Sequence, residues 1–156
     1  MGDNKFLQLA ISLSQEAVEN NKGGPFGCVV VKNGKIIGKG YNAVTSLNDP
    51  TAHAEIVAIR EACQNLNSFQ LEGCEIYSSC EPCPMCLGAI YWARPDAVYF
   101  ASTRSDAAEA GFDDAFIYDE INILPAKRKI KMIHNPAKEA LQVFQNWFEK
   151  KDKIKY

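Results

Sequence analysis

The sequence predicts an α/β fold in which helices cover both faces of a sheet. Segments with helical and with strand periodicity alternate along the chain, and Asn33-Gly34 joins two strand-like segments as a hairpin turn. With 156 residues, of which 47% are hydrophobic, the chain can bury a core of its own. It contains no internal repeat and no linker, so we expect a single domain over residues 1–156.

Local signals support each expected element in turn. Apolar residues from Phe6 to Ala17 recur at helical spacing, and Asp49-Pro50-Thr51 introduces a second helix that carries residues 53 and 55 in its first turn. Pro84 suits the first position of a third helix. The expected elements of this part are a helix over 6–17, strands over 26–32 and 35–41, the second helix, a strand near 74–79, the third helix, and a strand near 97–101.

The last third of the chain gives weaker signals. Short helical turns are the best interpretation of residues 102–125. Alternating polar and apolar residues predict a further strand over 129–133, and Asn135-Pro136 opens a last helix with apolar residues along one face.

Two motifs combine an imidazole, two thiols and a carboxylate. His53-Ala54-Glu55 provides the imidazole and the carboxylate, and Pro82-Cys83-Pro84-Met85-Cys86 provides both thiols. His53, Cys83 and Cys86 are one protein ligand short of a closed zinc site. A structural zinc normally has four protein ligands, whereas a catalytic zinc keeps three and leaves one position open. The missing ligand therefore predicts a catalytic metal, with Glu55 as the carrier of protons to and from water.

Other interpretations of these motifs are weaker. His134 could close a structural site, but it lies between a predicted strand and a helix, where an imidazole usually faces solvent. Cys80, Cys83 and Cys86 also form the start of an iron–sulfur run, but Ile90 stands where a fourth cysteine is needed.

Composition restricts the setting and the partners. The other three cysteines lie in apolar segments, and no signal peptide precedes them, so we expect a reducing, cytoplasmic location rather than disulfides in a secreted domain. A net charge of −2 argues against a large phosphate-binding surface and therefore against nucleic acid as a partner. No apolar run is long enough to cross a membrane.

Beyond single motifs, the chain resembles the cytidine deaminase superfamily. Residues 48–55 (NDPTAHAE) and 81–90 (EPCPMCLGAI) carry this resemblance, and they match the branch that holds tRNA adenosine deaminases and bacterial guanine deaminases. Three further segments favour the guanine branch: residues 23–27, 91–95 and 108–114.

This resemblance implies a fold, a cofactor and an assembly. The fold is a three-layer α/β/α sandwich with a mixed five-stranded sheet. Each subunit is expected to hold one Zn²⁺ through His53, Cys83 and Cys86, with Glu55 as the proton shuttle. The subunits are expected to form a homodimer in which C-terminal segments are exchanged and Tyr156 acts as a lid over the neighbouring site.

The resemblance also implies the groups that hold a purine. Asn42 is expected to donate a hydrogen bond to the base, and Asp114 to lie near the amino group that leaves. Phe26, Trp92 and Phe112 are candidates for the apolar walls of the pocket. Ordinary roles remain open for these residues: core packing for the aromatics, a turn for Asn42 and a helix cap for Asp114.

The function implied is hydrolytic deamination of guanine to xanthine and ammonia, a step of purine catabolism. Three alternatives stay open. A tRNA adenosine deaminase or a deaminase of cytosine or another small amine would use the same chemistry. A non-catalytic zinc-binding module would use the metal alone.

Overall fold

The computed structural model describes residues 2–156, which form two compact units divided between Asp114 and Ala115. The first unit contains the sheet and the predicted metal ligands. None of the helices within residues 2–156 is long and apolar enough to cross a membrane.

A four-stranded mixed sheet in the order β2-β1-β3-β4 organises the first unit. β1 (Gly27–Lys32) and β2 (Lys35–Tyr41) form the predicted hairpin, and Asn33 and Gly34 between them have the positive φ angles, 50° and 73°, that its tight turn requires. β1 is antiparallel to β3 (Cys74–Cys80), which is parallel to β4 (Ala97–Ser102). The mixed sheet is confirmed, but it has four strands instead of the expected five.

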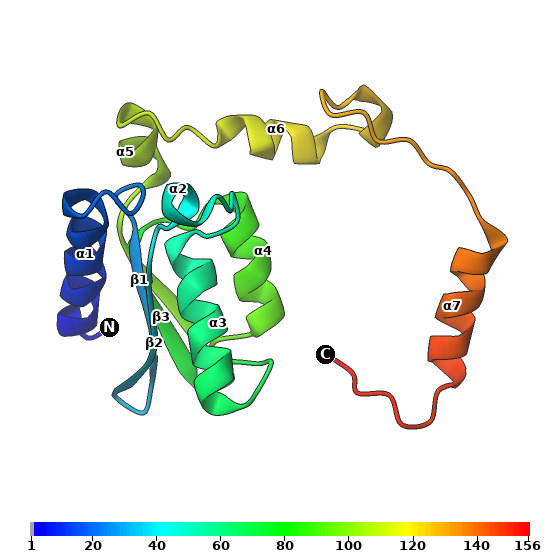
Figure 1. Ribbon diagram of the computed structural model, residues 1–156, viewed down its shortest axis with the longest axis horizontal. Helices are drawn as coiled ribbons and strands as arrows, with labels where there is room; N and C mark the ends of the chain where they lie inside the picture. The colour runs from blue at the N-terminus through cyan, green and yellow to red at the C-terminus, as the bar shows by residue number, and fades with distance from the viewer. Residues whose placement is uncertain (1) are drawn as a thin grey trace. The chain divides into compact units, whose positions relative to one another are not determined.

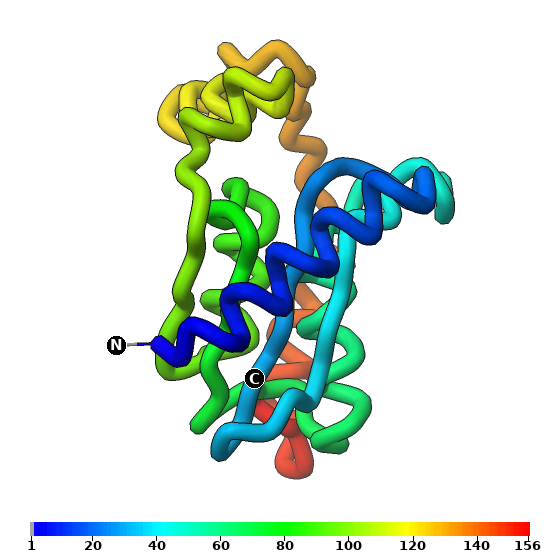
Figure 2. The backbone as a smooth tube through the Cα atoms, turned by 90° about the vertical axis from the view of Figure 1, so that its left-hand side faces the viewer, coloured from blue at the N-terminus to red at the C-terminus, as the bar shows by residue number. Residues whose placement is uncertain are grey.

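Helices cover both faces of this sheet, as predicted (Figure 1). α1 (Asn4–Glu19) packs on one face through Phe6 and Leu13, which form a core cluster with β1 and β3, and Figure 2 shows this helix running across the strands. α3 (Ala54–Leu66) and α4 (Pro84–Ala93) pack on the other face around Val30 and Ile76. The three-layer α/β/α arrangement is therefore confirmed in the first unit.

Close packing of α3 on β2 requires glycine in the strand. A Cβ on Gly40 would lie 2.5 Å from the carbonyl oxygen of Ala54 and 2.8 Å from the amide nitrogen of Ala58. These two atoms belong to the first turns of α3, so Gly40 determines how closely the beginning of this helix approaches the sheet.

Two details of the first unit differ from expectation. Asp49 does not cap α3: its carboxylate accepts hydrogen bonds from Thr51 within a turn, and α3 begins only at Ala54 with His53 as its N-cap residue. A short helix, α2 (Val44–Leu47), follows β2 and was not predicted. The expected helical turns after β4 are present as α5 (Arg104–Glu109).

The second unit contains α6 (Ala115–Asn122), the 3-10 turn η1 (Pro125–Lys127) and α7 (Lys138–Glu149). The predicted strand over 129–133 is wrong. Arg128 and Lys129 hydrogen-bond back to Glu120 of α6, and residues 130–137 form neither a helix nor a strand. Alternation makes a strand possible, but a strand also needs an edge to pair with.

Candidate active site

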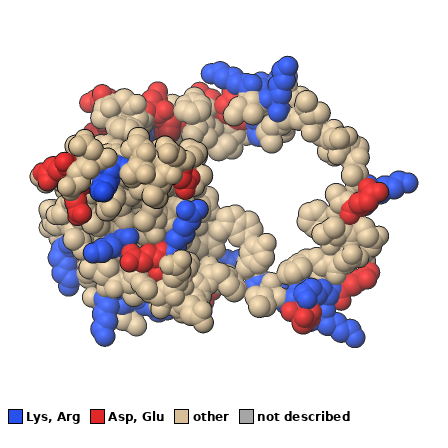
Figure 3. Space-filling model, viewed as in Figure 1, with Lys and Arg blue, Asp and Glu red and all other residues tan. Residues whose placement is uncertain are grey.

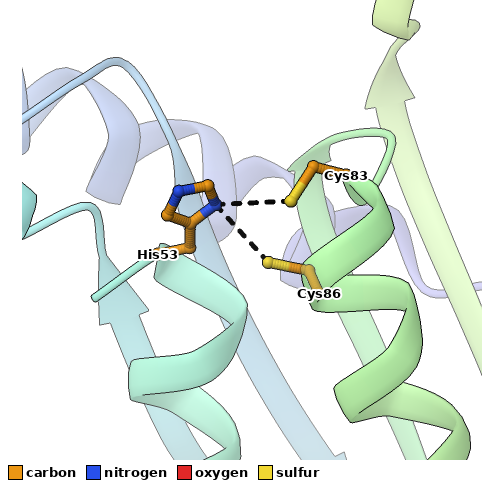
Figure 4. A group of neighbouring side chains, drawn as sticks. All are labelled: His53, Cys83 and Cys86. Atoms are coloured by element: carbon orange, nitrogen blue, oxygen red, sulfur yellow. Dashed lines mark hydrogen bonds between the residues drawn. The ribbon is translucent and has the colours of Figure 1, made fainter. Parts of the chain in front are cut away.

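Two helix N-termini bring the predicted metal ligands together (Figure 4). His53 and Cys83 are the N-cap residues of α3 and α4, and Cys86 lies one turn into α4. Pro84 occupies the first turn of α4, where its missing N–H costs no hydrogen bond. His53 Nδ1 lies 3.5 Å from the Cys83 sulfur and 3.6 Å from the Cys86 sulfur.

These distances fit a tetrahedral zinc ion. With Zn–S bonds of about 2.3 Å and Zn–N bonds of about 2.0 Å, the nitrogen and sulfur atoms of a tetrahedral site lie about 3.5 Å apart. The three ligand atoms all lie within 4.8 Å of one another. One imidazole and two thiols form a donor set that suits zinc, and the residues present therefore fit this metal.

The two thiols already share a negative charge. The pKa of Cys83 is lowered from 9.0 to about 4, chiefly because the Cys86 thiol donates to its sulfur, with a further contribution from His53. The pKa of Cys86 is raised because its proton is held by Cys83 and because the group is buried. Hydrogen bonding to Cys83 also raises the pKa of His53. A divalent cation removes the penalty on the second thiolate.

Glu55 lies beside this group, in the first turn of α3, with only 5% of its surface exposed. Its Oε1 accepts a hydrogen bond from the Ser78 hydroxyl at 3.0 Å, and its Oε2 accepts one from the Cys86 thiol at 3.4 Å. Burial raises the pKa of this carboxyl above its ordinary value. A carboxyl with a raised pKa, next to a metal-ligand group, is suited to both accepting and returning a proton.

One cavity of about 330 Å³ opens onto this group. Its lining combines two of the metal ligands and Glu55 with other apolar and polar groups: Gly24, Phe26, Asn42, Val44, Thr45, His53, Glu55, Cys80, Glu81, Cys83, Arg104, Ala107, Phe112, Asp113 and Asp114. The lining therefore contains every predicted site residue except Cys86, Trp92 and Tyr156.

Asn42 is held in a fixed orientation at the end of β2. Its Oδ1 accepts hydrogen bonds from the backbone N–H groups of Gly24 at 3.1 Å and Val44 at 3.3 Å. Gly23 packs so closely that a Cβ there would collide with Asn42. Because both backbone contacts use Oδ1, the Nδ2 group is the donor that can face the cavity.

Two aromatic rings and one carboxyl complete the predicted pocket. The rings of Phe26 and Phe112 meet edge to face, with centroids 5.0 Å apart and an interplanar angle of 86°. Both line the cavity, so an apolar wall is available for a flat ring. Asp114 also lines the cavity, and partial burial raises the pKa of its carboxyl.

The remaining predicted residues lie elsewhere. Trp92, on α4, is 64% exposed and does not line this cavity. Tyr156 belongs to the second unit and is 68% exposed. Their roles at the site stay predictions. His134 is exposed, as expected, and the Cys80 thiol donates to the carbonyl of Thr103 at 3.5 Å instead of joining the metal ligands.

Sequence reasoning did not identify Arg104, Thr45 or Ser78. Arg104 follows the carboxyl end of β4, which is parallel to β3. Ligands bind at the carboxyl ends of parallel strands, and this rule could have placed Arg104 near the site. Ser78 is a hydroxyl in an otherwise apolar strand face, which is a signal for a buried polar contact. No signal in the sequence marks Thr45.

Comparison with known proteins agrees with this geometry. Residues 1–102 match the family described as the cytidine and deoxycytidylate deaminase zinc-binding region. The chain belongs to this family of zinc-binding deaminases. It is 53% identical to the guanine deaminase of Bacillus subtilis over 156 residues, which is the full length of both chains.

A solved structure and a second relative extend the comparison. The crystal structure of Bacillus subtilis guanine deaminase superposes with a TM-score of 0.97, and the match covers 100% of this chain and 99% of that one. The tRNA-specific adenosine deaminase of Aquifex aeolicus is 39% identical over 151 residues, which is 96% of each chain. The similarity to the guanine deaminase is thus higher in both identity and coverage.

Proposed function

We propose that this protein catalyses the zinc-dependent hydrolytic deamination of guanine to xanthine and ammonia. The observation that carries the proposal is a single cavity that opens onto a three-ligand metal group and is lined by a buried carboxyl and a fixed amide donor. The full-length similarity to a guanine deaminase supports the choice of substrate.

His53 Nδ1, Cys83 Sγ and Cys86 Sγ hold the metal in this proposal. Zinc supplies Lewis-acid chemistry, which lowers the pKa of a water molecule to roughly 7. Glu55 accepts a proton from the water that attacks the amino-bearing ring carbon, C2 of guanine. It gives this proton to the ring nitrogen, then accepts the second proton from the new hydroxyl group and passes it to the amino group as the C2–N bond breaks and ammonia leaves. Its raised pKa suits both transfers.

The remaining residues of the cavity recognise the base. Asn42 Nδ2 donates a hydrogen bond to an acceptor on the purine, while its Oδ1 is held by the backbone. Asp114 lies near the amino group and accepts from it. Phe26 and Phe112 together form an apolar wall for the ring and exclude water.

A tRNA adenosine deaminase is the second candidate, and the 39% identity to the Aquifex aeolicus enzyme favours it. Charge argues against it. The net charge is −2, and on the face drawn in Figure 3 the Lys and Arg side chains are interspersed with Asp and Glu. An RNA-binding surface normally concentrates positive charge.

Assembly and location are part of the same proposal. We propose a homodimer with exchanged C-terminal segments, in which Tyr156 of one chain covers the cavity of the other. The metal group needs Cys83 and Cys86 as free thiols, and both are free in the structure. A reducing compartment maintains free thiols, so we place the protein in the cytoplasm.

The test is a parallel assay of zinc-loaded protein with guanine, cytosine, adenosine, guanosine and a tRNA anticodon stem-loop. Ammonia release and the identity of the product base are followed for each. We expect xanthine from guanine and slow reactions with the others. Inosine in the stem-loop with no turnover of guanine would favour the tRNA deaminase. Turnover of cytosine alone would show that the cavity binds a pyrimidine and not a purine.

A further inference from the structure

Ser78 is a buried hydroxyl on a face of β3 that is otherwise apolar. On this face Cys74 and Ile76 belong to the core cluster under α3 and α4, and Ser78 is the next residue of the same alternation. It is 1% exposed. Burying a hydroxyl costs free energy unless it makes a hydrogen bond, so the partner of Ser78 indicates why the residue is polar.

That partner is the carboxylate of Glu55, whose Oε1 accepts from Ser78 Oγ at 3.0 Å. The donor is rigidly placed, because β3 pairs with β1 and β4 at this position, where Cys28 and Phe100 are opposite Ser78. Because two strand ladders fix the backbone of Ser78, its hydroxyl can follow a rotating carboxylate only by rotation about the Cα–Cβ bond. The contact therefore orients Glu55.

The two carboxylate oxygens have different surroundings. Oε2 lies 3.4 Å from the Cys86 sulfur and is the oxygen next to the metal-ligand group. Metal ligation requires Cys86 as a thiolate, which has no S–H to donate. Oε2 then loses the hydrogen bond from Cys86, whereas Oε1 keeps the one from Ser78.

We infer that Ser78 is a positioning residue, which holds Oε1 of Glu55 and leaves Oε2 directed at the reacting water and the substrate. This inference rests on the proposed function, because it assigns Ser78 a role through Glu55 in the deamination. It also divides the work between the oxygens: Oε1 anchors the carboxylate, and Oε2 exchanges the proton.

The first test is Ser78→Ala in zinc-loaded, full-length protein. Loss of a hydrogen bond to a charged group is expected to lower kcat by about 10- to 100-fold. Three other quantities should stay within about twofold of their values in the parent protein. They are KM for guanine, the zinc content, and the inhibition constant of hypoxanthine, which has no 2-amino group. The matched control is Ser79→Ala, which removes a neighbouring buried hydroxyl that accepts from the Gly27 N–H and does not touch Glu55.

A double-mutant cycle separates positioning from general structural damage. In a Glu55→Gln background, Ser78→Ala should lower the residual kcat by less than twofold, because the group through which Ser78 acts is already gone. The shift in the urea unfolding midpoint caused by Ser78→Ala should also be smaller in that background. This second measurement does not depend on turnover.

A shape-matched pair covers the case in which Ser78→Ala does not fold. Ser78→Thr and Ser78→Val have nearly the same shape, and only the former keeps a hydroxyl. We expect Thr to retain most of the parent kcat and Val to lose it. Equal kcat for Thr and Val, or a full loss for Ser78→Ala in the Glu55→Gln background, would overturn the inference.

The same data distinguish the two proposals. Active parent protein with inactive Glu55→Gln, but with Ser78→Ala as fast as Ser79→Ala, would overturn the role of Ser78 and leave the proposed function standing. Parent protein that does not deaminate guanine would overturn both.

Discussion

Burial makes Glu55 useful as a proton carrier, because desolvation disfavours its charged form and raises its pKa. Three contacts limit this effect: its own backbone N–H, Cys86 and Ser78 all lower the pKa. The carboxyl is thus neither a permanently charged surface acid nor a permanently neutral one. The raised pKa makes the carboxyl a better proton acceptor than an ordinary surface carboxylate.

Glu55→Gln tests this role directly. We expect a fall in kcat of about 10²- to 10⁴-fold, the usual contribution of general acid–base catalysis. Zinc content should be unchanged, because Glu55 is not one of the three ligands. The measurement is steady-state guanine turnover beside metal analysis of the same samples, with Cys83→Ala as the contrasting variant that loses metal. A Gln variant as fast as the parent would remove the proton relay from the mechanism.

The two polar atoms of the Asn42 side chain have different roles, so substitutions can distinguish structural support from recognition of the base. Asn42→Asp keeps an oxygen for the N–H groups of Gly24 and Val44 but removes the Nδ2 donor. We expect kcat/KM for guanine to fall by about 10- to 100-fold, with little change in thermal stability. Asn42→Ala removes both and should also lower the unfolding free energy by about 1–2 kcal/mol. If Asp preserved kcat/KM, the base would not be held through Nδ2.

The pH dependence of metal binding follows from the thiol pair. Zinc needs both thiolates and a neutral imidazole, so it competes with protons and its affinity falls as pH falls. The pKa of Cys83 is about 4, so this thiol is already ionised at neutral pH, and Cys86 holds the remaining proton of the pair. His53 adds a second proton below its own raised pKa.

We therefore expect zinc to displace about one proton from its protein ligands at alkaline pH, where only Cys86 is protonated. A water in the open position, with a pKa of roughly 7, adds about one more, so the total at pH 8.5 should be about two per ion. Titration of metal-free protein with zinc in a weakly buffered pH-indicator solution gives this number. Three protons released at pH 8.5 would mean that Cys83 is an ordinary protonated thiol in the free protein.

At the scale of elements, the site depends on where two helices begin. Pro84 and the spacing of Cys83 and Cys86 were sufficient to predict the start of α4 from sequence, because proline favours the first turn of a helix. The start of α3 was predicted a few residues too early, because Asp49 is a good capping residue by type. In the structure its carboxylate binds Thr51, a local competitor that composition does not reveal.

The packing of α3 on β2 could not be predicted, because it depends on a distance. Gly40 reads in sequence as a flexible strand residue, whereas the structure leaves no room for a Cβ between it and the first turns of α3. Contacts of this kind join residues that are distant along the chain, and neither periodicity nor motif spacing reports them. The same limit hid the contact between Ser78 and Glu55.

Gly40→Ala tests whether this close approach supports the metal site. Overpacking should lower the unfolding free energy by about 1–3 kcal/mol and shift the first turn of α3, which weakens zinc affinity through His53. The control is Gly88→Ala in α4, where an added Cβ has nothing within 4 Å, and alanine should stabilise the helix by about 0.5–1 kcal/mol. Chemical unfolding and zinc titration of both variants provide the comparison. Unchanged zinc affinity in Gly40→Ala would show that the packing of α3 on β2 does not determine the geometry of the metal ligands.

At the scale of the whole molecule, the first unit agrees with its sequence better than the second. The hairpin and the alternation of helices and strands are local signals, and both were confirmed between residues 4 and 102. The ligand motifs are local as well, and the structure brings the side chains of His53, Cys83 and Cys86 together. The second unit, residues 115–156, has no buried residue. The alternating segment after Arg128 and the amphipathic helix α7 have sequence patterns that are typical of partly buried elements. Neither of them is buried within this unit.

The apolar residues of α7 are not covered within the second unit. Leu141, Phe144 and Phe148 are 71%, 73% and 74% exposed, and they recur at helical spacing. An exposed apolar face of this size usually marks an interface. A second copy of this chain is the partner that the proposed homodimer supplies, and exchange of C-terminal segments would cover this face while bringing Tyr156 to the neighbouring cavity.

Complementation between two defective chains tests the exchange. Glu55→Gln has an intact tail and no proton carrier, whereas a chain without residues 153–156 has Glu55 and no Tyr156. In a mixed dimer with exchanged tails, the cavity that contains Glu55 is covered by the intact tail of the other chain. Unfolding and refolding the two chains together should therefore give more guanine turnover than the sum of the chains refolded separately.

A lid that acts within its own chain would give only that sum, because neither chain carries both groups. A shortened chain as active as the parent would mean that the tail does not cover the site, and measuring its mass in solution would show whether the dimer persists without the tail.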